Sequence, residues 1–256
     1  MLYALVVIYN KKCIDSKTLN NLLKYKEKIK IVIYDNSTKD FENEEFCKQE
    51  KIMYYTKRKN VGLSKAYNYV ISQIKYDKED YIIILDDDTE LNDEYFSEVF
   101  SKVKNTQADI LLPIVKSNNQ IISPSLIQFG CRVIQLQDLN CIDINKITAI
   151  NSGMVIKMKV FESTKYCEKI FLDYVDHYFM KEIREKQYNI KVMDSCIMQN
   201  FSRNEKQSIE SVRFRFNIYK KDFKKYCDMC GHHLYYYINI NKLRLVYFLK
   251  YKKIFF

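Results

Sequence analysis

Short apolar runs alternate with amphipathic stretches over the first hundred residues of the chain. Four runs rich in Val, Ile, Leu and Tyr predict buried strands, at 3–9, 30–34, 52–55 and 81–85. Between the third and fourth runs, apolar residues fall on one face of a helix, namely Leu63, Ala66, Tyr67, Val70, Ile71 and Ile74. The segment NDEYFSEVFSKV predicts another helix, which Asn92 can cap and whose first turn is acidic.

This alternation predicts an α/β fold with a mostly parallel central sheet flanked by helices. Beyond residue 109 the pattern is less regular and predicts four short strands and two helices, at 110–115, 126–130, 148–156 and 189–193 and at 176–187 and 208–230. No repeat and no Pro- or Ser-rich linker divides the chain. We therefore expect one domain over residues 1–204, followed by a helical, basic and aromatic extension over residues 205–256.

The net charge of +10 is concentrated at one end of the chain. Residues 201–256 contain 13 Lys and Arg against 4 Asp and Glu, so the rest is nearly neutral and the charge indicates an attachment surface on the extension. No apolar run approaches the roughly 20 residues of a membrane span. The start MLYALVVIYNKK lacks the features of a signal peptide, so we expect a cytoplasmic protein whose eight cysteines are reduced thiols.

Three consecutive carboxylates, Asp86, Asp87 and Asp88, follow the fourth apolar run. Ligands of parallel α/β sheets bind beyond the carboxyl ends of the strands, and alternate residues point the same way, so Asp86 and Asp88 can face one space. Two carboxylates in one space raise each other's pKa unless a cation lies between them, and Mg²⁺ and Mn²⁺ prefer carboxylate and phosphate oxygens. A solvated acidic turn before the helix at Asn92 explains the triplet equally well.

The segment KRKNVGLSKAYN (57–68) follows a predicted strand and opens a predicted helix. Gly62 permits close approach of the backbone to a ligand, and Arg58 carries a guanidinium suited to phosphate. The segment lacks the GxGxxG and GK[ST] patterns of phosphate-binding loops, and capping of the helix by Asn60 or Ser64 is the simpler interpretation.

The segment FLDYVDHYFMKEIR (171–184) places Asp173 and Asp176 three residues apart around a predicted helix start. An acid at this place can act as a general base toward a hydroxyl group. Capping of the helix explains both acids without any ligand, and the segment alone favours that interpretation.

Taken in chain order, these segments resemble the family 2 glycosyltransferases with a GT-A fold, and within them the rhamnosyltransferase-like branch. The resemblance rests on VVIYN, IVIYDNST, KNVGLSKAYN, ILDDDTEL, NSGMVIKMKVF and FLDYVDHYF. It covers about residues 3–220, and the last two segments are the most specific to the branch. It implies an inverting glycosyltransferase that moves a sugar from a UDP-, dTDP- or GDP-sugar to a hydroxyl of a glycan or lipid-linked acceptor in surface polysaccharide synthesis.

The resemblance also implies roles for individual residues. The triplet takes the place of the DxD motif, with Asp88 as the direct ligand of Mg²⁺ or Mn²⁺ and Asp86 as a second, nearer the ribose. Asp176 falls on the position of the catalytic base, which accepts the proton of the acceptor hydroxyl as that oxygen attacks the anomeric carbon. The other implied contacts are Tyr9, Asn10, Asp35, Asn36, Arg58, Asn60, Asp86 and Asp87 for the nucleotide, Asp173 for the acceptor, and Asn151, Ser152 and Gly153 for the donor sugar and acceptor.

Two positions depart from the pattern of the branch. Tyr178 stands where an acidic residue often follows the base by two positions, and Asn200 stands where a histidine often follows the late strand. The second departure removes a third metal ligand supplied by the protein, so we expect weaker metal binding or a site completed by solvent. His177 neighbours Asp176 but lies on a different helical face, and we interpret it as a bystander.

Two other functions are compatible with parts of the pattern. A metal-dependent nucleotidyltransferase also uses an α/β sheet with acidic ligands, but residues 9–17 contain no glycine for the phosphate loop that it needs. A nucleic-acid-binding module would use the tail NKLRLVYFLKYKKIFF (241–256), which equally suits an anionic membrane surface or a partner chain. Because such enzymes often act on lipid-linked acceptors, we favour contact with the inner face of the membrane or a homodimer contact, and expect no nucleic acid.

The motif CDMCGHH (227–233) has part of the spacing of a haem or zinc site. Gly231 separates Cys230 from the histidines, which a haem attachment motif does not allow, and no second CxxC completes a zinc site. We therefore interpret the motif as two thiols one helical turn apart.

Overall fold

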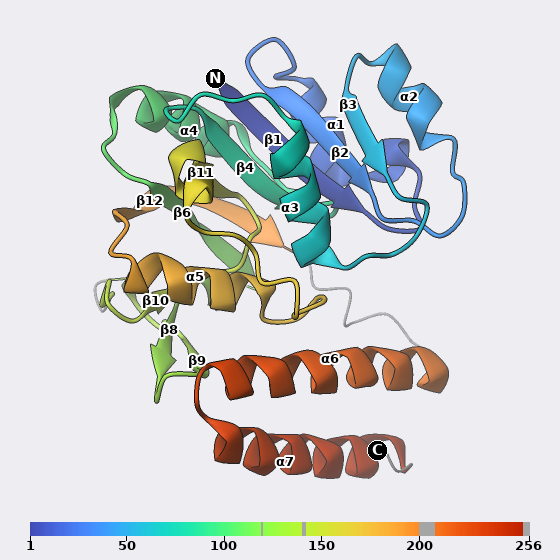
Figure 1. The fold of residues 1–256 in the computed structure, drawn as a ribbon, viewed down its shortest axis with the longest axis vertical. Coiled ribbons are helices and arrows are strands. Elements are labelled where there is room, and N and C mark those ends of the chain that lie inside the picture. Colours follow the sequence, from blue (N-terminus) through green and yellow to red (C-terminus); the bar gives the residue numbers. More distant parts are fainter. Residues whose placement is uncertain (119, 140–141, 200–207, 253–256) are drawn as a thin grey trace.

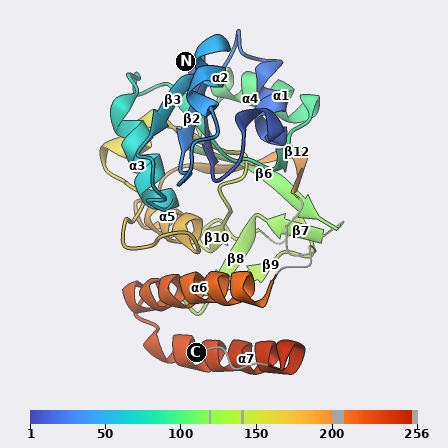
Figure 2. The ribbon, with the colours of Figure 1, turned by 90° about the vertical axis from the view of Figure 1, so that its right-hand side faces the viewer.

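A computed structural model describes residues 1–118, 120–139, 142–199 and 208–252. Within these residues, a central nine-stranded sheet carries helices on both faces, as Figures 1 and 2 show. Its strands lie in the order β3 (Met53–Thr56), β2 (Lys30–Asp35), β1 (Leu2–Ile8), β4 (Tyr81–Asp86), β11 (Met154–Lys157), β6 (Ile110–Ser117), β12 (Ile190–Gln199) and β5 (Thr89–Glu90), with β7 (Gln120–Ser123) beside β6. The predicted α/β fold is confirmed.

The sheet has a parallel half and a mixed half. β1, β2, β3 and β4 are parallel, as their unbroken apolar runs predict, whereas β11 lies antiparallel between β4 and β6. The strand predicted at 148–156 is divided between two sheets: its first residue, Thr148, belongs to β10 (Ile147–Thr148), and its last three belong to β11. β10 pairs with β8 (Ser125–Gln128), which pairs with β9 (Arg132–Gln135), so these form a separate antiparallel sheet.

Alternate residues of the central strands face two apolar cores. The even-numbered residues 2–8 of β1 face the helices α1 (Lys17–Leu23), α2 (Asn43–Gln49) and α4 (Asp93–Asn105). The odd-numbered residues 3–7 face the core that includes α3 (Leu63–Gln73) and α5 (Val175–Glu185). Short 3-10 helices occur at η1 (Cys13–Asp15) and η3 (Met158–Glu162). Asn92 caps α4 as predicted, because its Oδ1 accepts a hydrogen bond from the Tyr95 N–H at 2.9 Å.

The C-terminal segment contributes a helix to the core that includes α3 and α5. α6 (Ile209–Met229) buries Val212, Phe216, Phe223, Tyr226 and Cys227 there, and α7 (His233–Tyr251) packs on α6 as the outermost layer in Figure 1. The boundary expected near residue 204 lies outside the described residues. None of the helices in the described ranges is long and apolar enough to cross a membrane.

One buried acid ties α6 to the segment before α5. The Asp222 carboxylate is 1% exposed and accepts hydrogen bonds from the N–H groups of Phe171, Leu172 and Asp173, at 3.0, 2.7 and 3.1 Å. Three backbone donors are therefore satisfied by one side chain 49 to 51 residues away. This contact holds the backbone just before α5.

Candidate active site

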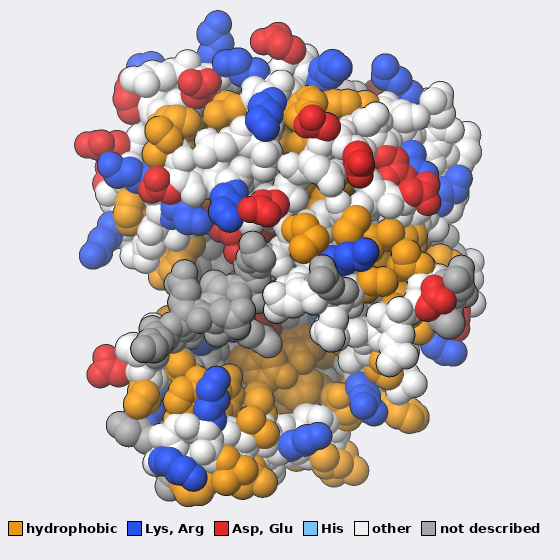
Figure 3. Space-filling model, turned by 180° about the vertical axis from the view of Figure 1, so that it is seen from behind, with side chains coloured by type: hydrophobic (Ala, Val, Ile, Leu, Met, Phe, Trp, Pro, Cys, Tyr) orange, Lys and Arg blue, Asp and Glu red, His pale blue; other side chains and the backbone are white. Residues whose placement is uncertain are grey.

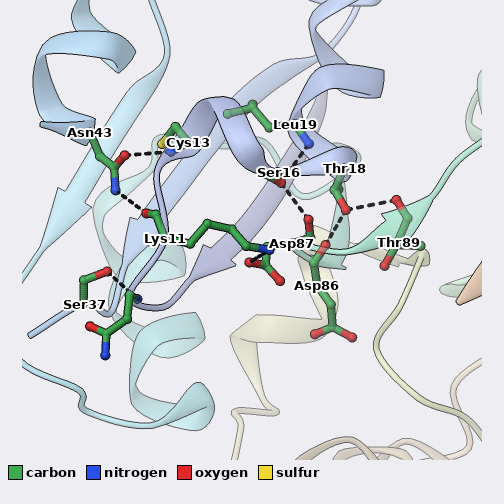
Figure 4. Close-up of polar contacts among 11 residues, drawn as sticks. Lys11, Cys13, Ser16, Thr18, Leu19, Ser37, Asn43, Asp86, Asp87 and Thr89 are labelled. Atoms are coloured by element: carbon green, nitrogen blue, oxygen red, sulfur yellow. Dashed lines mark hydrogen bonds and ion pairs between the residues drawn. The ribbon is translucent and has the colours of Figure 1, made fainter. Parts of the chain in front are cut away.

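The backbone of the acidic turn after β4 is held by side chains at the start of α1 (Figure 4). Thr18 Oγ1 donates to the carbonyl oxygen of Asp86 at 2.6 Å, and Ser16 Oγ donates to that of Asp87 at 2.8 Å. The two acidic side chains point apart: the Asp87 carboxylate forms an ion pair with Lys11 Nζ at 2.7 Å, and that of Asp86 is directed away from Lys11. Asp87 is thus neutralised within the chain, while Asp86 is not.

The Asp86 carboxylate is held through one of its two oxygens. Ser152 Oγ donates to Oδ2 at 2.6 Å, and Gln199 Nε2 donates to the same oxygen at 3.0 Å. No donor in the described part of the chain contacts Oδ1. Burial raises the pKa of this carboxyl to about 6, and the charges of Asp88 and Asp176 act in the same direction. The ionised form therefore needs a positive charge that the described residues do not place there.

Asp88 shares this electrostatic environment. Burial and the charge of Asp87 raise the pKa of its carboxyl, while Lys11 and a hydrogen bond from Gln199 act in the opposite direction. Two carboxyls with raised pKa values and an open oxygen suit a hard divalent cation such as Mg²⁺ or Mn²⁺. Across the described ranges, no group of three or more His, Cys, Asp and Glu side chains is arranged to hold a metal ion. Asp86 and Asp88 would therefore need further oxygen ligands of another kind.

Asp35, at the end of β2, is fully engaged within the protein. Its Oδ1 accepts from the Ser37 N–H at 2.9 Å, and its Oδ2 accepts from Asn43 Nδ2 at 2.8 Å and from the Tyr54 hydroxyl at 2.9 Å. Asn43 in turn holds the loop after β1, because Cys13 N–H donates to its Oδ1 at 2.7 Å. Asp35 therefore holds together the edge of the sheet at the end of β2.

Asn36 and Asn60 join the end of β2 to the loop before α3. Asn36 Nδ2 donates to Asn60 Oδ1 at 2.9 Å, and that oxygen also accepts the Gly62 N–H at 3.0 Å. Gly62 has φ +83°, and a Cβ there would lie 2.6 Å from the carbonyl oxygen of Phe171. Only glycine fits this approach of two loops, so Gly62 has a structural role that explains it without a ligand.

Three other residues predicted on the nucleotide side lie at the same edge. Asn10 has a left-handed backbone with φ 49°, its N–H donates to Ser37 Oγ at 2.8 Å, and its Oδ1 accepts the Thr38 N–H at 3.1 Å. Tyr9 is exposed. Arg58 is also exposed, and its guanidinium lies 3.6 Å from the Asp40 carboxylate. Such a surface pair is weak, so Arg58 is available to an anion.

The loop 151–153 faces the acidic turn from the other side. Ser152 provides the short hydrogen bond to Asp86, and Asn151 accepts one from the Tyr166 hydroxyl at 3.2 Å. Gly153 donates its N–H to the carbonyl oxygen of Ile84 at 2.9 Å and has φ +77°. The loop is thereby fixed against β4.

Asp176 lies half-buried in the first turn of α5. Its Oδ1 accepts the His177 N–H at 2.7 Å. After burial, its charge contributes to the raised pKa values of Asp86 and of the Tyr166 hydroxyl. The ring of Tyr166, whose hydroxyl donates to Asn151, stacks on Phe179 of α5 with 4.3 Å between the ring centroids. Tyr166 therefore joins the loop beside Asp86 to the helix that carries Asp176. His177 has a structural contact: its Nδ1 lies 2.8 Å from Thr148 Oγ1, so it links α5 to β10.

Asp173 is not brought into this space as a free carboxylate. Both its oxygens are bound by the guanidinium of Arg215 on α6, one of them at 2.6 Å. Of the two departures from the branch, Tyr178 packs against the apolar core, and Asn200 lies outside the described residues.

Sequence reasoning missed Lys11, Gln199 and Asp222. Lys11 directly follows Asn10, so its place at the edge of the sheet could have been inferred. Gln199 and Asp222 gave no local signal, because their partners lie 113 and about 50 residues away.

The fold, with a sheet whose parallel half ends in asparagines and acids, is that of the GT-A glycosyltransferases. The chain belongs to glycosyl transferase family 2, whose family model matches residues 3–164. The resemblance drawn from the sequence segments is therefore confirmed.

Individual relatives are more distant. The chain is similar to the dTDP-rhamnosyl transferase RfbF of Shigella flexneri, with 26% identity over 183 residues that cover 68% of this chain and 60% of that protein. It therefore spans less than two thirds of that relative's length. TarS 1-349 of S. aureus in complex with UDP-GlcNAc shares 16% identity, with a TM-score of 0.55 over 85% of this chain and 66% of that one. GalNAc-T7 with UDP, GalNAc and Mn²⁺ shares 12% identity, with a TM-score of 0.60 over 88% and 50%. These two structures share the fold.

Proposed function

We propose that this chain is an inverting, metal-dependent glycosyltransferase that moves a sugar from a nucleoside-diphosphate sugar to a hydroxyl of a glycan or lipid-linked acceptor in surface polysaccharide synthesis. The observation that carries the proposal is the contact between two distant segments: Ser152 and Asn151 join the end of β4 through Tyr166 to α5, whose first turn carries Asp176. Asp86 lies at the carboxyl end of β4, where ligands of such sheets bind, and Asp176 would face the acceptor.

Asp88 and Asp86 would hold Mg²⁺ or Mn²⁺. The open Oδ1 of Asp86 and the raised pKa values of both carboxyls support this assignment, because a bound cation would favour their ionised forms. When bound, the ion would neutralise charge on the departing diphosphate. Lys11, already paired with Asp87, would lie at the rim of the same site.

Asp176 would be the general base. The His177 N–H fixes its Oδ1, which leaves Oδ2 for the proton of an acceptor hydroxyl. That hydroxyl oxygen would form the new bond at the anomeric carbon as the bond to the diphosphate breaks on the opposite face. One displacement inverts the anomeric centre and requires no covalent intermediate with the enzyme. Asp173, paired with Arg215, would border the acceptor rather than exchange a proton with it.

The base of the donor nucleotide would lie at the end of β2. A pocket of about 100 Å³ there is lined by Asp35, Tyr54, Thr56 and Arg58 among others. Asn10, Asn36 and Asn60 border the same edge, and Asn151, Ser152 and Gly153 would face the donor sugar.

The outer face of α7 supports contact with a membrane surface. Leu234, Ile238, Leu245 and Leu249 are more than half exposed on it. Residues 233–251 contain three Lys and Arg and no Asp or Glu. Hydrophobic and basic side chains together cover the lower end of the molecule in Figure 3. An apolar face with a basic rim suits anionic headgroups, so we propose a cytoplasmic enzyme held at the inner face of the membrane; a homodimer through the same face is the alternative.

The test is a screen of UDP-, dTDP- and GDP-sugars for binding and metal-dependent hydrolysis, followed by two variants. Asp176→Asn should bind the donor as the parent does and lose transfer by at least about 100-fold. Asp88→Ala should lose the dependence of nucleotide binding on Mn²⁺. If no nucleotide sugar binds with Mn²⁺ or Mg²⁺ present, the proposed function is wrong. Full transfer by Asp176→Asn would remove this residue as the base.

A further inference from the structure

Gln199 is held beside the acidic turn by the pairing of two short strand ends. It is the last residue of β12, and it pairs in register with Thr89 of β5, the residue that follows Asp88. Its side chain is only 6% exposed. The amide of Gln199 is therefore placed by the sheet itself, next to both carboxylates that would hold the cation.

The orientation of this amide follows from its partner. Asp86 Oδ2 accepts a hydrogen bond from the Gln199 side chain at 3.0 Å, and a carboxylate cannot donate when ionised, so the nitrogen must face Asp86. The carbonyl oxygen Oε1 then lies at the other branch of the amide. It is buried and has no hydrogen-bond partner in the described part of the chain.

A buried carbonyl oxygen without a partner is unfavourable, and native proteins rarely retain one without a reason. Amide oxygens are ligands that hard divalent cations accept alongside carboxylates. The side chain meets three conditions at once: it is fixed in place, it touches the acid pair, and it presents an unused oxygen.

We propose that Gln199 supplies its Oε1 as a third protein ligand to the divalent cation held by Asp86 and Asp88, while its Nε2 positions Asp86. The inference rests on the proposed metal-dependent function. It replaces the expectation drawn from Asn200, that the chain supplies no third ligand after the late strand. An all-oxygen site of this kind favours Mg²⁺ and Mn²⁺ and disfavours the metals that prefer a histidine nitrogen.

Metal binding without catalysis tests this directly. Mn²⁺ is titrated into the full chain, alone and with saturating UDP or dTDP, and free Mn²⁺ is measured by electron paramagnetic resonance. Gln199→Leu should weaken binding about 10-fold or more. Gln199→Glu, which keeps an oxygen but loses the donor, should bind Mn²⁺ at least as tightly as the parent. Gln199→His should shift the ratio of Co²⁺ to Mg²⁺ affinity by about 10-fold toward Co²⁺.

The His variant separates a ligand from a positioning residue. If Gln199 only positions Asp86 through its N–H, Gln199→His, which keeps a ring N–H donor, should leave the ratio of Co²⁺ to Mg²⁺ affinity unchanged, and that result overturns the inference. Binding by Gln199→Leu within twofold of the parent also overturns it. Gln135→Leu, at an exposed glutamine on β9, is the matched control and should bind as the parent.

The experiment distinguishes an error in the proposed metal-dependent function from an error in the proposed role of Gln199. If the parent binds no Mn²⁺ even with nucleotide, both the metal-dependent function and the role of Gln199 are wrong. If the parent binds Mn²⁺ and the Gln199 variants do not differ from it, the role of Gln199 alone is wrong. Thermal unfolding of every variant without metal confirms that each is folded.

Discussion

Replacing Asp222 by alanine is expected to destabilise the fold by about 3–5 kcal/mol. The buried carboxylate accepts three backbone N–H bonds, from Phe171, Leu172 and Asp173 at 2.7 to 3.1 Å. A hydrogen bond to a charged group contributes about 1.5–3 kcal/mol, and bonds that share one acceptor are not additive. The segment is only partly buried, so water can satisfy some of the freed donors, and the expected loss therefore lies at or below the lower end of the simple sum of about 4.5–9 kcal/mol.

Urea unfolding of the parent and of Asp222→Ala, followed by circular dichroism at pH 7, measures this loss. Donor hydrolysis should fall as well, because the freed segment leads directly into α5 and Asp176. Asp228→Ala is the matched control on α6: its carboxylate pairs with Lys224 at 2.6 Å near the surface and should contribute less than about 1 kcal/mol. If Asp222→Ala also loses less than 1 kcal/mol and hydrolyses donor normally, α6 is a removable extension and the reasoning is wrong.

Three further predictions concern the metal, the loops and the tail. The pKa of Asp86 is about 6 in the fold, against an ordinary 3.8. The protonated carboxyl therefore stabilises the fold by roughly 3 kcal/mol relative to the ionised form. This stabilisation is fully present below about pH 4 and is lost as the pH rises through 6. Mn²⁺ should therefore raise the urea midpoint more at pH 7 than at pH 5; equal increments would contradict this. Gly62→Ala should lose about 1–3 kcal/mol because its Cβ would meet Phe171, whereas Gly231→Ala, with φ +76° and nothing within 4 Å, should lose about 1 kcal/mol or less. Leu245→Glu should reduce co-sedimentation with vesicles containing phosphatidylglycerol; unchanged sedimentation, or a change only in the oligomeric state seen by gel filtration, would refute the membrane contact.

The strands whose ends carry the candidate site could be predicted, because continuous apolar runs in the sequence indicate buried strands. β1, β2 and β4 are apolar on both faces, so their ends, and the polar residues Asn10, Asn36 and Asp86 that follow, could be assigned to one edge. The prediction was less successful at 148–156. There the apolar run passes from one sheet to another through Asn151–Gly153, and the turn depends on φ +77° at Gly153, which periodicity does not report.

The sequence showed that the C-terminal segment carries the excess of Lys and Arg. This charge lies on the exposed side of α6 and does not reveal what the apolar side of the helix packs against. The spacing of apolar residues over 208–230 predicted α6, whose bounds are Ile209–Met229. The spacing could not show that the apolar face of α6 packs into the same core as α5. It also could not show that Asp222, whose neighbours in the sequence are lysines, is a buried hydrogen-bond acceptor. Those properties depend on contacts with residues near position 171, which no local pattern contains.

The metal site shows the same limit at the scale of a single residue. The resemblance directed attention to Asn200, where a histidine often stands, and implied that a third ligand was missing. Gln199, one position earlier, lies within β12, and the register of that strand decides which of its side chains reach the acids. The pairing of Gln199 with Thr89 sets that register, and it turns Gln199 toward Asp86. If Gln199 is a ligand, the departure at Asn200 does not weaken the site, because the strand presents an oxygen from the residue before it.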